Sequence, residues 1–309
     1  MSTEVAGARR GEDFMARRKA AARGLDPVSL PDYALFAASC RRGLSVVYPF
    51  NSDAYADEEG WKYGARWPPS HKAFGRMRGL LAAQDSARLG PRRVLEVAAG
   101  GGGLAALLAL GGCEVVVNDL RAEHLADAVR EFEGGERVRL VGGNLFDLSP
   151  QSLGRFDLVI ACEVIEHVAH PGDLLAHLKR FLAPGGRLLL TTPNGSYFRN
   201  RLPTYSEVDD PARLEAVQFR PDADGHLFLL TPRELAGLAE AAGLSVERLS
   251  AWGTPVLSGH AGLRFLSGPR LTRVAYEAER LAQRLPPAAR VRACAQLSAV
   301  LRRPASDGG

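Results

Sequence analysis

The chain has 309 residues, of which 46% are hydrophobic and 24% are charged, a composition typical of an ordinary soluble globular protein. Its formal net charge of +4 comes from the two ends: residues 1–30 and 261–309 carry excesses of +2 and +6, which leaves residues 31–260 at −4. This distribution argues against a nucleic-acid-binding protein, which more often carries a basic stripe interleaved with aromatic residues.

Neither a disulfide framework nor a membrane anchor is expected from the sequence. The four cysteines are scattered, with neither metal-ligand nor disulfide spacing. No apolar run has the length of a signal peptide or of a membrane span. We therefore expect a cytoplasmic protein with reduced thiols and no transmembrane segment.

The middle of the chain alternates between strand-like and helix-like segments. Short apolar, β-branched segments predict strands at 92–98, 114–119, 138–141, 156–161, 187–192 and 245–251. A helix is expected to begin near Pro171 and to stop at Pro184-Gly185-Gly186. Thr231-Pro-Arg-Glu234 reads as a capping box that begins another helix, with Gly243 as its C-cap.

Strands that are apolar almost throughout and alternate with helices predict a parallel sheet covered on both faces. The fold class is therefore α/β, a doubly wound, Rossmann-like, mainly parallel seven-stranded sheet with cap insertions. The segment 296–303 is expected to return as the last, antiparallel strand. A late amphipathic helix shows one apolar face, made of Leu271, Val274, Ala278, Leu281 and Leu285.

Three regions follow from this pattern. Residues 1–88 are expected to form an N-terminal cap of helices and loops, with aromatic residues clustered at 48–67 that either line a ligand pocket or form a small core. Residues 89–254 form the core, with a polar insertion at 195–226 whose length is typical of a lid or binding loop. Residues 255–309 form a C-terminal cap helix and the closing strand.

A glycine-rich turn follows the first predicted strand. Gly100-Gly101-Gly102-Gly103-Leu104-Ala105 satisfies the pattern G-x-G-x-x-G/A, and Asp119 falls where that pattern expects an acid that binds ribose. Taken alone, this turn fits any adenosine cofactor, because glycines let the cofactor approach the backbone closely. A nicotinamide-dependent oxidoreductase is therefore one hypothesis, and a merely flexible turn is another.

The residues around this turn separate the hypotheses. The sequence VLEVAAGGG resembles the first signature of class I S-adenosylmethionine-dependent methyltransferases, with Glu96 at the acidic position. Ala98 replaces the usual first glycine, so a positive φ is no longer cheap there, and Gly100 and Gly102 match the next two positions. The resemblance extends over more than 150 residues, through the fourth strand to the Pro-Gly-Gly turn, features that an oxidoreductase leaves unexplained.

The resemblance implies a site for S-adenosylmethionine at the carboxyl ends of the first four strands. Asp119 would hold both ribose hydroxyls. Asn144 stands where the family often has aspartate, and its amide carbonyl can still accept from the adenine amino group. The implied cofactor site consists of Glu96, Ala98, Gly100, Gly102, Asp119, Leu120, Asn144, Leu145 and Glu163.

The element Glu163-x-x-Glu166-His167 resembles the E-x-x-E-H element of ubiquinone-biosynthesis O-methyltransferases and of some metal-using methyltransferases. In one hypothesis His167 is a general base for an acceptor hydroxyl, with Glu166 and His226 as further catalytic candidates. In a second, Glu163, Glu166 and His167 bind a divalent ion such as Mg²⁺, with His226 as the candidate fourth ligand. In a third, the element only packs its loop. We assign no metal ligand from the sequence.

The sequence thus predicts an S-adenosylmethionine-dependent methyltransferase that acts on a small molecule, through O-methylation of a hydroxyl. A catalytically silent methyltransferase-like protein remains the alternative within the same fold. The arginine-rich late helix allows a peripheral contact with an anionic membrane, although a solvated face is the simpler interpretation. The acceptor, the metal requirement and the oligomeric state do not follow from the sequence.

Overall fold

A computed structural model of the protein describes residues 25–40, 69–99, 102–120, 134–216, 226–262 and 268–305. Its strands are β1 (Arg93–Val97), β2 (Glu114–Asp119), β3 (Val138–Gly142), β4 (Phe156–Cys162), β5 (Leu182–Pro193), β6 (Ser245–Trp252) and β7 (Gln296–Arg302). They form one sheet in the order β3-β2-β1-β4-β5-β7-β6. β7 runs antiparallel to both of its neighbours and the other adjacent pairs are parallel. The predicted fold class and the antiparallel closing strand are confirmed.

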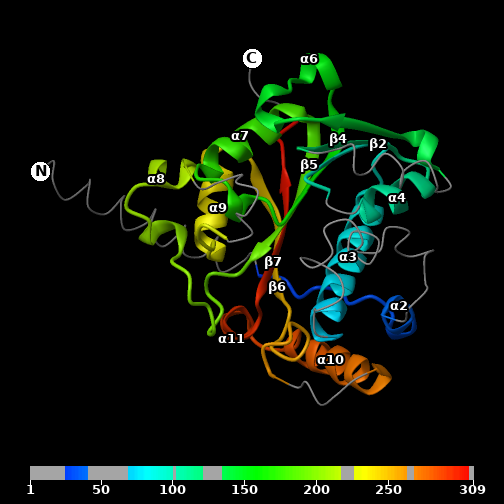
Figure 1. Ribbon diagram of the computed structural model, residues 1–309, viewed down its shortest axis with the longest axis vertical. Coiled ribbons are helices and arrows are strands. Elements are labelled where there is room, and N and C mark those ends of the chain that lie inside the picture. The colour runs from blue at the N-terminus through cyan, green and yellow to red at the C-terminus, as the bar shows by residue number, and fades with distance from the viewer. Residues whose placement is uncertain are drawn as a thin grey trace, which may run out of the picture.

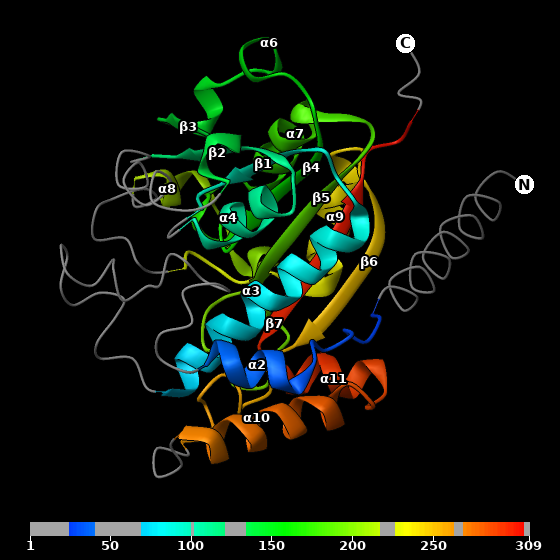
Figure 2. The ribbon, with the colours of Figure 1, turned by 90° about the vertical axis from the view of Figure 1, so that its right-hand side faces the viewer.

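Helices cover both faces of this sheet (Figure 1). On one face lie α3 (Pro69–Leu89) and α4 (Gly103–Leu110), and on the other lie α7 (Pro171–Phe181) and α9 (Pro232–Ala241). At one end of the molecule lie α2 (Tyr33–Ser39), α10 (Gly268–Ala282) and α11 (Pro287–Ala293) (Figure 2). The shorter helices are η1 (Gly135–Arg137), η2 (Leu145–Asp147), α6 (Pro150–Leu153), η3 (Ile165–His167), η4 (Tyr205–Glu207) and α8 (Ala212–Glu215).

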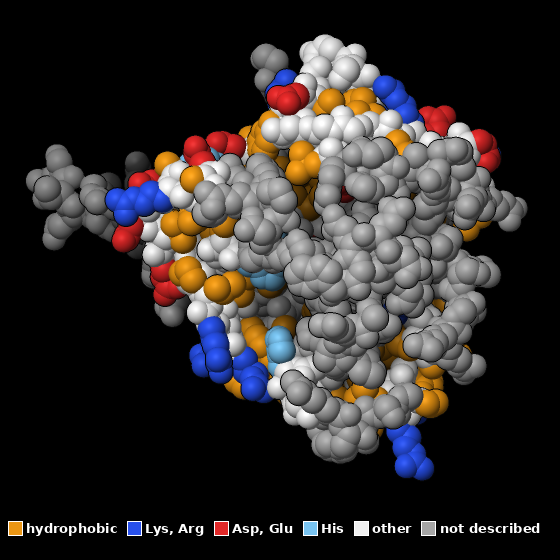
Figure 3. All heavy atoms as spheres, viewed as in Figure 1, with side chains coloured by type: hydrophobic (Ala, Val, Ile, Leu, Met, Phe, Trp, Pro, Cys, Tyr) orange, Lys and Arg blue, Asp and Glu red, His pale blue; other side chains and the backbone are white. Residues whose placement is uncertain are grey.

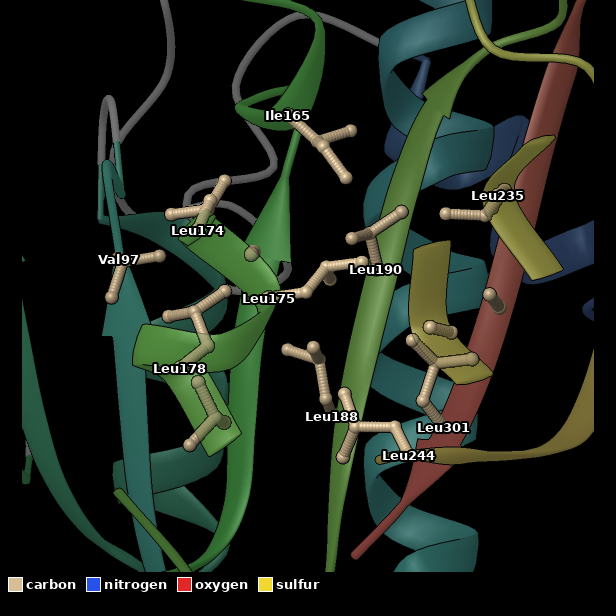
Figure 4. Packing of buried hydrophobic residues seen from close by; sticks show 14 of the residues in the cluster. Val97, Ile165, Leu174, Leu175, Leu178, Leu188, Leu190, Leu235, Leu244 and Leu301 are labelled. Carbon is tan, nitrogen blue, oxygen red and sulfur yellow. The ribbon is translucent and has the colours of Figure 1, made fainter. Parts of the chain in front are cut away.

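The two covered faces explain why the strands are apolar almost throughout. Successive side chains of a strand point to opposite faces, so Val94 of β1 packs on the α4 side while Leu95 packs on the α7 side. Figure 4 shows the α7 side, where Leu175, Leu178 and Leu190 interdigitate between helix and sheet. Because helices cover both faces, both sets of side chains are mainly apolar.

The Pro-Gly-Gly segment does not lie outside the fifth strand, as the sequence predicts, but inside β5 as an irregularity. Pairing with β4 joins Phe156 to Leu182 and then resumes at Leu158 and Arg187. Gly185 has a φ of +75°, and a Cβ on Gly186 would lie 2.9 Å from the Ala183 carbonyl oxygen and 3.0 Å from that of Phe156. A bulge of this tightness requires glycine.

The predicted lid insertion is partly structured. Residues 195–216 contain η4 and α8, and Thr204 forms an isolated parallel bridge with Leu229. The rest of the insertion and the aromatic cluster at 48–67 lie outside the described residues. The three-region division itself stays a prediction. No helix in the described ranges has the length and hydropathy that a membrane span needs.

The predicted apolar face of the late helix is wrong. Leu271 is buried as predicted, but Val274 and Leu281 are 43% and 56% exposed, and Ala275 and Ala282 occupy the interior in their place. The helix is rotated because its buried face also carries Glu279, which is fully buried. The buried Glu279 therefore decides which side of the helix faces the core, although Val274 and Leu281 are larger apolar side chains than Ala275 and Ala282.

Glu279 fastens α10 to the loop that follows β6. Its carboxylate accepts hydrogen bonds from the backbone N–H groups of Gly253 at 3.1 Å and Thr254 at 2.8 Å, and from Nε2 of Gln283 at 2.8 Å. Burial raises the pKa of this carboxyl, while the donated hydrogen bonds oppose that shift. The residue is thus a satisfied buried acid with a structural role.

Replacing Glu279 by alanine is expected to destabilise the protein by about 3 kcal/mol or more, because two buried N–H groups lose their acceptor. This corresponds to a decrease in melting temperature of roughly 5 °C or more, measurable by calorimetry. Glu277→Ala is the matched control on the same helix, since Glu277 only forms ion pairs with Arg273 and Arg280 at the surface. Equal shifts for the two variants would contradict the anchoring role.

Candidate functional site

The predicted site residues gather at the carboxyl edge of the sheet, where a parallel sheet places its ligands. Glu96 lies near the end of β1, beside the first turns of α4, and is only 5% exposed. Burial raises the pKa of its carboxyl to about 8, Asp119 adds to the shift, and the N–H of Ala105 opposes it. The Glu96 Oε2 atom has no hydrogen-bond partner among the residues that the structure describes. A buried, unsatisfied carboxyl oxygen at this position points to a ligand that satisfies it.

The backbone after β1 is strained. Ala98 takes a φ of +51°, and Gly102, the residue before α4, takes +67°. The sequence led us to expect that alanine would avoid this conformation; the structure places it there at a cost of about 1–2 kcal/mol. Ala98 donates its N–H to the Asn118 carbonyl at 2.8 Å, which ties the turn to β2. Gly100 lies outside the described residues.

Asp119 and Leu120 follow β2, at the edge next to β1. Asp119 is half-buried, while Leu120 is 54% exposed, an unusual position for a leucine at the end of a core strand. The buried Asn118 beneath them donates from Nδ2 to the carbonyls of Val141 at 2.9 Å and Gly143 at 3.0 Å. This bridge holds the loop after β3 against the end of β2.

The loop after β3 contains the predicted residues Asn144 and Leu145, and the next residue, Phe146, also reaches the surface. Asn144 begins η2 and accepts the N–H of Phe146 at 3.1 Å, which leaves its carbonyl oxygen a second lone pair. The Leu145 side chain is buried, and its carbonyl accepts a hydrogen bond from Nε2 of His177 at 2.9 Å. The side chain that reaches the surface is Phe146, which is 37% exposed. Leu120 and Phe146 together offer apolar surface to a flat ring.

The carboxylate of Glu163, a predicted cofactor residue and candidate metal ligand, is bound by side chains of the protein. Its carboxylate is shared by Arg78 of α3 at 2.7 Å, by the Thr191 hydroxyl at 2.7 Å, and by Nε2 of Gln296. Glu163 also has a φ of +57°, and Ala98 is the other non-glycine residue with positive φ in the described ranges. Strain of this kind persists where the surroundings over-determine a conformation, and it clusters at functional sites.

Glu166 and His226, which are 60 residues apart in the sequence, meet at the end of β4. Glu166 is fully buried; its Oε2 accepts from the Thr192 hydroxyl at 3.0 Å, and its Oε1 has no hydrogen-bond partner in the described part of the chain. His226 Nε2 lies 3.9 Å from that Oε1, and the His167 and His226 rings lie 5.0 Å apart, edge to face. The three predicted catalytic candidates therefore form one cluster.

The charge states of the Glu166–His226 pair follow from its burial. Burial raises the pKa of Glu166 well above its usual range, and the neighbouring Glu163 raises it further. Burial also lowers the pKa of His226, with His167 adding to that effect. Although 3.9 Å is within ion-pair range, both shifts favour the neutral forms, and the distance is too long for a hydrogen bond. A neutral imidazole beside a buried carboxylic acid is suited to accept a proton.

The same cluster can be regarded as a metal site. Ligand atoms of Glu166, His167 and His226 all lie within 4.8 Å of one another. His226, the fourth ligand that the sequence suggests, belongs to this group, whereas the Glu163 carboxylate is paired with Arg78. Two imidazoles and one carboxylate favour a borderline transition ion over Mg²⁺, which prefers oxygen ligands.

Several of these partners carry no sequence signal. Arg78, Thr191, Thr192 and Gln296 come from three different elements and do not form a motif. Histidine side chains reach the surface among hydrophobic ones on the face shown in Figure 3. Of the other histidines, His170 pairs with Glu215, and His177 binds the carbonyl of Leu145 in the loop after β3.

Comparison with known proteins adds independent observations. Residues 70–249 match the family described as the methyltransferase domain. The ubiquinone biosynthesis O-methyltransferase of Xanthomonas axonopodis pv. citri (strain 306) is 32% identical over 169 residues, which are 53% of this chain and 68% of that protein. The protein of the same name from Dechloromonas aromatica (strain RCB) is 31% identical over 162 residues, covering 52% of this chain and 68% of its own.

Two solved structures share the fold at low sequence identity. The CcbJ methyltransferase from Streptomyces caelestis superposes with a TM-score of 0.50 and 20% identity, covering 84% of this chain and 98% of that one. The [4+2]-cyclase SpnF superposes with a TM-score of 0.51 and 17% identity, covering 92% of this chain and 100% of that one. At these identities the likeness shows the fold alone, and the two names differ in chemistry.

Proposed function

The chain belongs to the methyltransferase domain family and is an S-adenosylmethionine-dependent methyltransferase, and we propose that it methylates a hydroxyl group of a small molecule. The family match removes the reason for considering a nicotinamide-dependent oxidoreductase, which shared only the glycine turn and Asp119. What stays open is the acceptor and the way in which its hydroxyl is activated.

The residues at the carboxyl edge fit S-adenosylmethionine. The orphaned Oε2 of Glu96 is a buried acceptor suited to a cationic group, and the half-buried Asp119 suits a pair of ribose hydroxyls. Leu120, after β2, and Phe146, after the paired strand β3, expose apolar surface at the carboxyl edge of the sheet, which suits an adenine ring. The bound cofactor supplies an electrophilic methyl group on a sulfonium. Asn144 adds an acceptor for the adenine amino group.

The observation that carries the hydroxyl acceptor is the pairing of the buried Glu166 with His226. The neutral imidazole accepts the proton of the acceptor hydroxyl, and the Glu166 Oε1 atom, 3.9 Å from Nε2 of His226, lies beside the imidazolium that forms. Thr192 orients the carboxyl by donating to its Oε2. The protein otherwise contributes orientation of the acceptor oxygen and exclusion of water. In this arrangement His226, rather than His167, is the base, because it faces the carboxyl directly.

The similarity to ubiquinone biosynthesis O-methyltransferases supports the same acceptor class, since the names of those proteins specify transfer to oxygen. Identity near 30% over about half of this chain supports the reaction class and not the acceptor molecule. The regions that would select the acceptor include residues 195–216, which lie inside the matched segment, and the loop after β6, which lies outside it.

A second mechanism uses the cluster of Glu166, His167 and His226 as ligands of a divalent ion. Their donor atoms are close enough to share one ion, which would lower the pKa of a bound hydroxyl and replace the need for a base. We propose the base mechanism first, because burial already holds His226 neutral and ready to accept a proton.

The test begins with isothermal titration calorimetry of S-adenosylhomocysteine into the protein, in buffer, with EDTA and with added Mn²⁺ or Zn²⁺. Micromolar binding that is unchanged by EDTA is expected. A screen of phenols and catechols with radiolabelled cofactor then tests turnover and the atom methylated. Labelling confined to amine or carbon acceptors would contradict the hydroxyl acceptor. Cofactor binding without turnover on any acceptor class would favour the catalytically silent alternative.

A further inference from the structure

The exposed side of α10 carries apolar residues that a solvated helix does not need. Val274 and Leu281 are 43% and 56% exposed, and Leu285, in the turn that continues the helix, is 39% exposed. At about 100° per residue, Val274 and Leu281 lie within roughly 20° of one line along the helix. These residues form an apolar stripe beside the face that packs on the core. Single exposed leucines are ordinary, but an aligned row of them marks a contact surface.

Arginines flank this stripe on the side away from the core. Arg270, Arg273, Arg280 and Arg284 are exposed. Arg273 and Arg280 share the single acid Glu277, at 3.0 and 2.7 Å. Arg270 and Arg284 form no ion pair with any residue in the described ranges. The exposed side of α10 therefore combines apolar side chains with an excess of positive charge.

A second exposed apolar and basic segment adjoins α10 through α11. Arg290 of α11 donates to the carbonyls of Gln283 and Leu285, both at 3.1 Å, and the Arg292 carbonyl accepts the N–H of Phe198 at 2.9 Å. Phe198 is 58% exposed and is followed by Arg199, which is also exposed. Figure 3 shows basic side chains beside hydrophobic ones at this end of the molecule, and Figure 2 shows α10 forming that end.

Buried contacts between α10 and the core hold this surface in its position. Glu279 holds α10 by its bonds to Gly253 and Thr254, and Leu271 and Ala275 pack on the core behind it. The helix cannot rotate to bury Val274 and Leu281 without breaking those buried hydrogen bonds. The fold therefore keeps the apolar stripe and its arginines at the surface.

We propose that this surface, defined by Val274, Leu281, Leu285 and Phe198 with Arg270 and Arg284, docks onto an anionic phospholipid membrane. An interfacial helix inserts its apolar stripe at the boundary between headgroups and acyl chains, while the flanking arginines bind lipid phosphates. Charge complementarity selects lipid over an apolar protein partner, because four arginines face a single acid on the exposed side of α10. The membrane contact is separate from the methyl-transfer site and does not depend on the proposed acceptor.

Vesicle flotation with the full chain tests the proposal. Binding to vesicles of equal parts phosphatidylglycerol and phosphatidylcholine is expected, with little binding to phosphatidylcholine alone and weaker binding as salt increases. Arg270→Glu combined with Arg284→Glu is expected to weaken binding by at least roughly thirtyfold, at about 1 kcal/mol per arginine near the surface. Leu281→Ser with Phe198→Ser is expected to weaken it as well, since less apolar surface inserts.

The matched control is Arg137→Glu with Arg139→Glu, which makes the same change in net charge on exposed arginines at η1 and β3. The control is expected to bind vesicles as the wild type does. Equal loss in the control would show that net charge alone drives binding and would overturn the proposal. So would wild-type binding by the α10 variants, or a dimer in light scattering that Leu281→Ser dissociates, since a second copy would then cover the stripe.

Discussion

The Glu96→Gln protein is expected to melt at a higher temperature than the wild type at neutral pH without cofactor, and to bind S-adenosylmethionine more weakly. Burial raises the pKa of Glu96 to about 8, whereas the same carboxyl in the unfolded chain ionises near 4.5. Folding therefore takes up a proton between these values, and stability is lost as the pH rises from about 4.5 to 8. Glutamine removes this penalty, which amounts to roughly 3 kcal/mol at pH 7.

The same substitution removes the group that is expected to balance the charge of the cofactor. A hydrogen bond to a charged group contributes about 1.5–3 kcal/mol, so the dissociation constant should increase about tenfold to a hundredfold. In the wild type, affinity should rise with pH through about 8 and level off only above that value, because the Glu96 carboxyl must release its proton. In Glu96→Gln this pH dependence should be absent.

Thermal unfolding and calorimetric titration at pH 6, 7 and 8 measure both effects, on S-adenosylmethionine and on S-adenosylhomocysteine. A larger loss for the sulfonium-bearing cofactor would place Glu96 next to the sulfur, and equal losses would place it next to the amino group. Glu114→Gln, an exposed change at the start of β2, is the matched control and should alter neither property. A variant that loses stability and keeps its affinity would refute the role of Glu96.

The His226→Ala protein is expected to retain cofactor affinity and to lose about two to four orders of magnitude in kcat, the range that a general base contributes. His226 must be neutral to take the hydroxyl proton, and burial lowers its pKa below the usual 6.5. The activity of the wild type should therefore increase with pH only below 6.5 and reach its plateau before neutrality. Once the acceptor is known, steady-state kinetics over pH 5 to 8 measure this profile.

His170→Ala serves as the control, because His170 pairs with Glu215 away from the cluster and should leave kcat unchanged. The metal mechanism gives a different outcome. EDTA would then abolish the activity of the wild type, Mn²⁺ or Zn²⁺ would restore it, and His226→Ala would lose bound metal by elemental analysis. Full activity of His226→Ala would contradict both mechanisms.

The strands, the main helices and the fold class could be predicted because their signals are local. Apolar segments of strand length, the helical spacing after Pro171, and the capping box of Thr231 and Glu234 each depend on residues within a few positions of one another. The structure reproduces that box, with Glu234 accepting from Thr231 at 2.7 Å. A sheet with both faces covered then follows, because apolar strands need two partners.

The site could be predicted only as a set of residues, and the tertiary structure decided which of them act together. Glu163 is held by Arg78 and Gln296, from opposite ends of the chain, and this excludes it from the cluster in which His226 joins Glu166. Likewise, the buried hydrogen bonds of Glu279 orient α10 so that Val274 and Leu281 lie at the surface, although the apolar spacing predicts that they face the core. The sequence by itself determined the main elements, the fold class and the cofactor family. Pairings between distant residues were decided by packing and by the satisfaction of buried polar groups, which short-range periodicity does not encode.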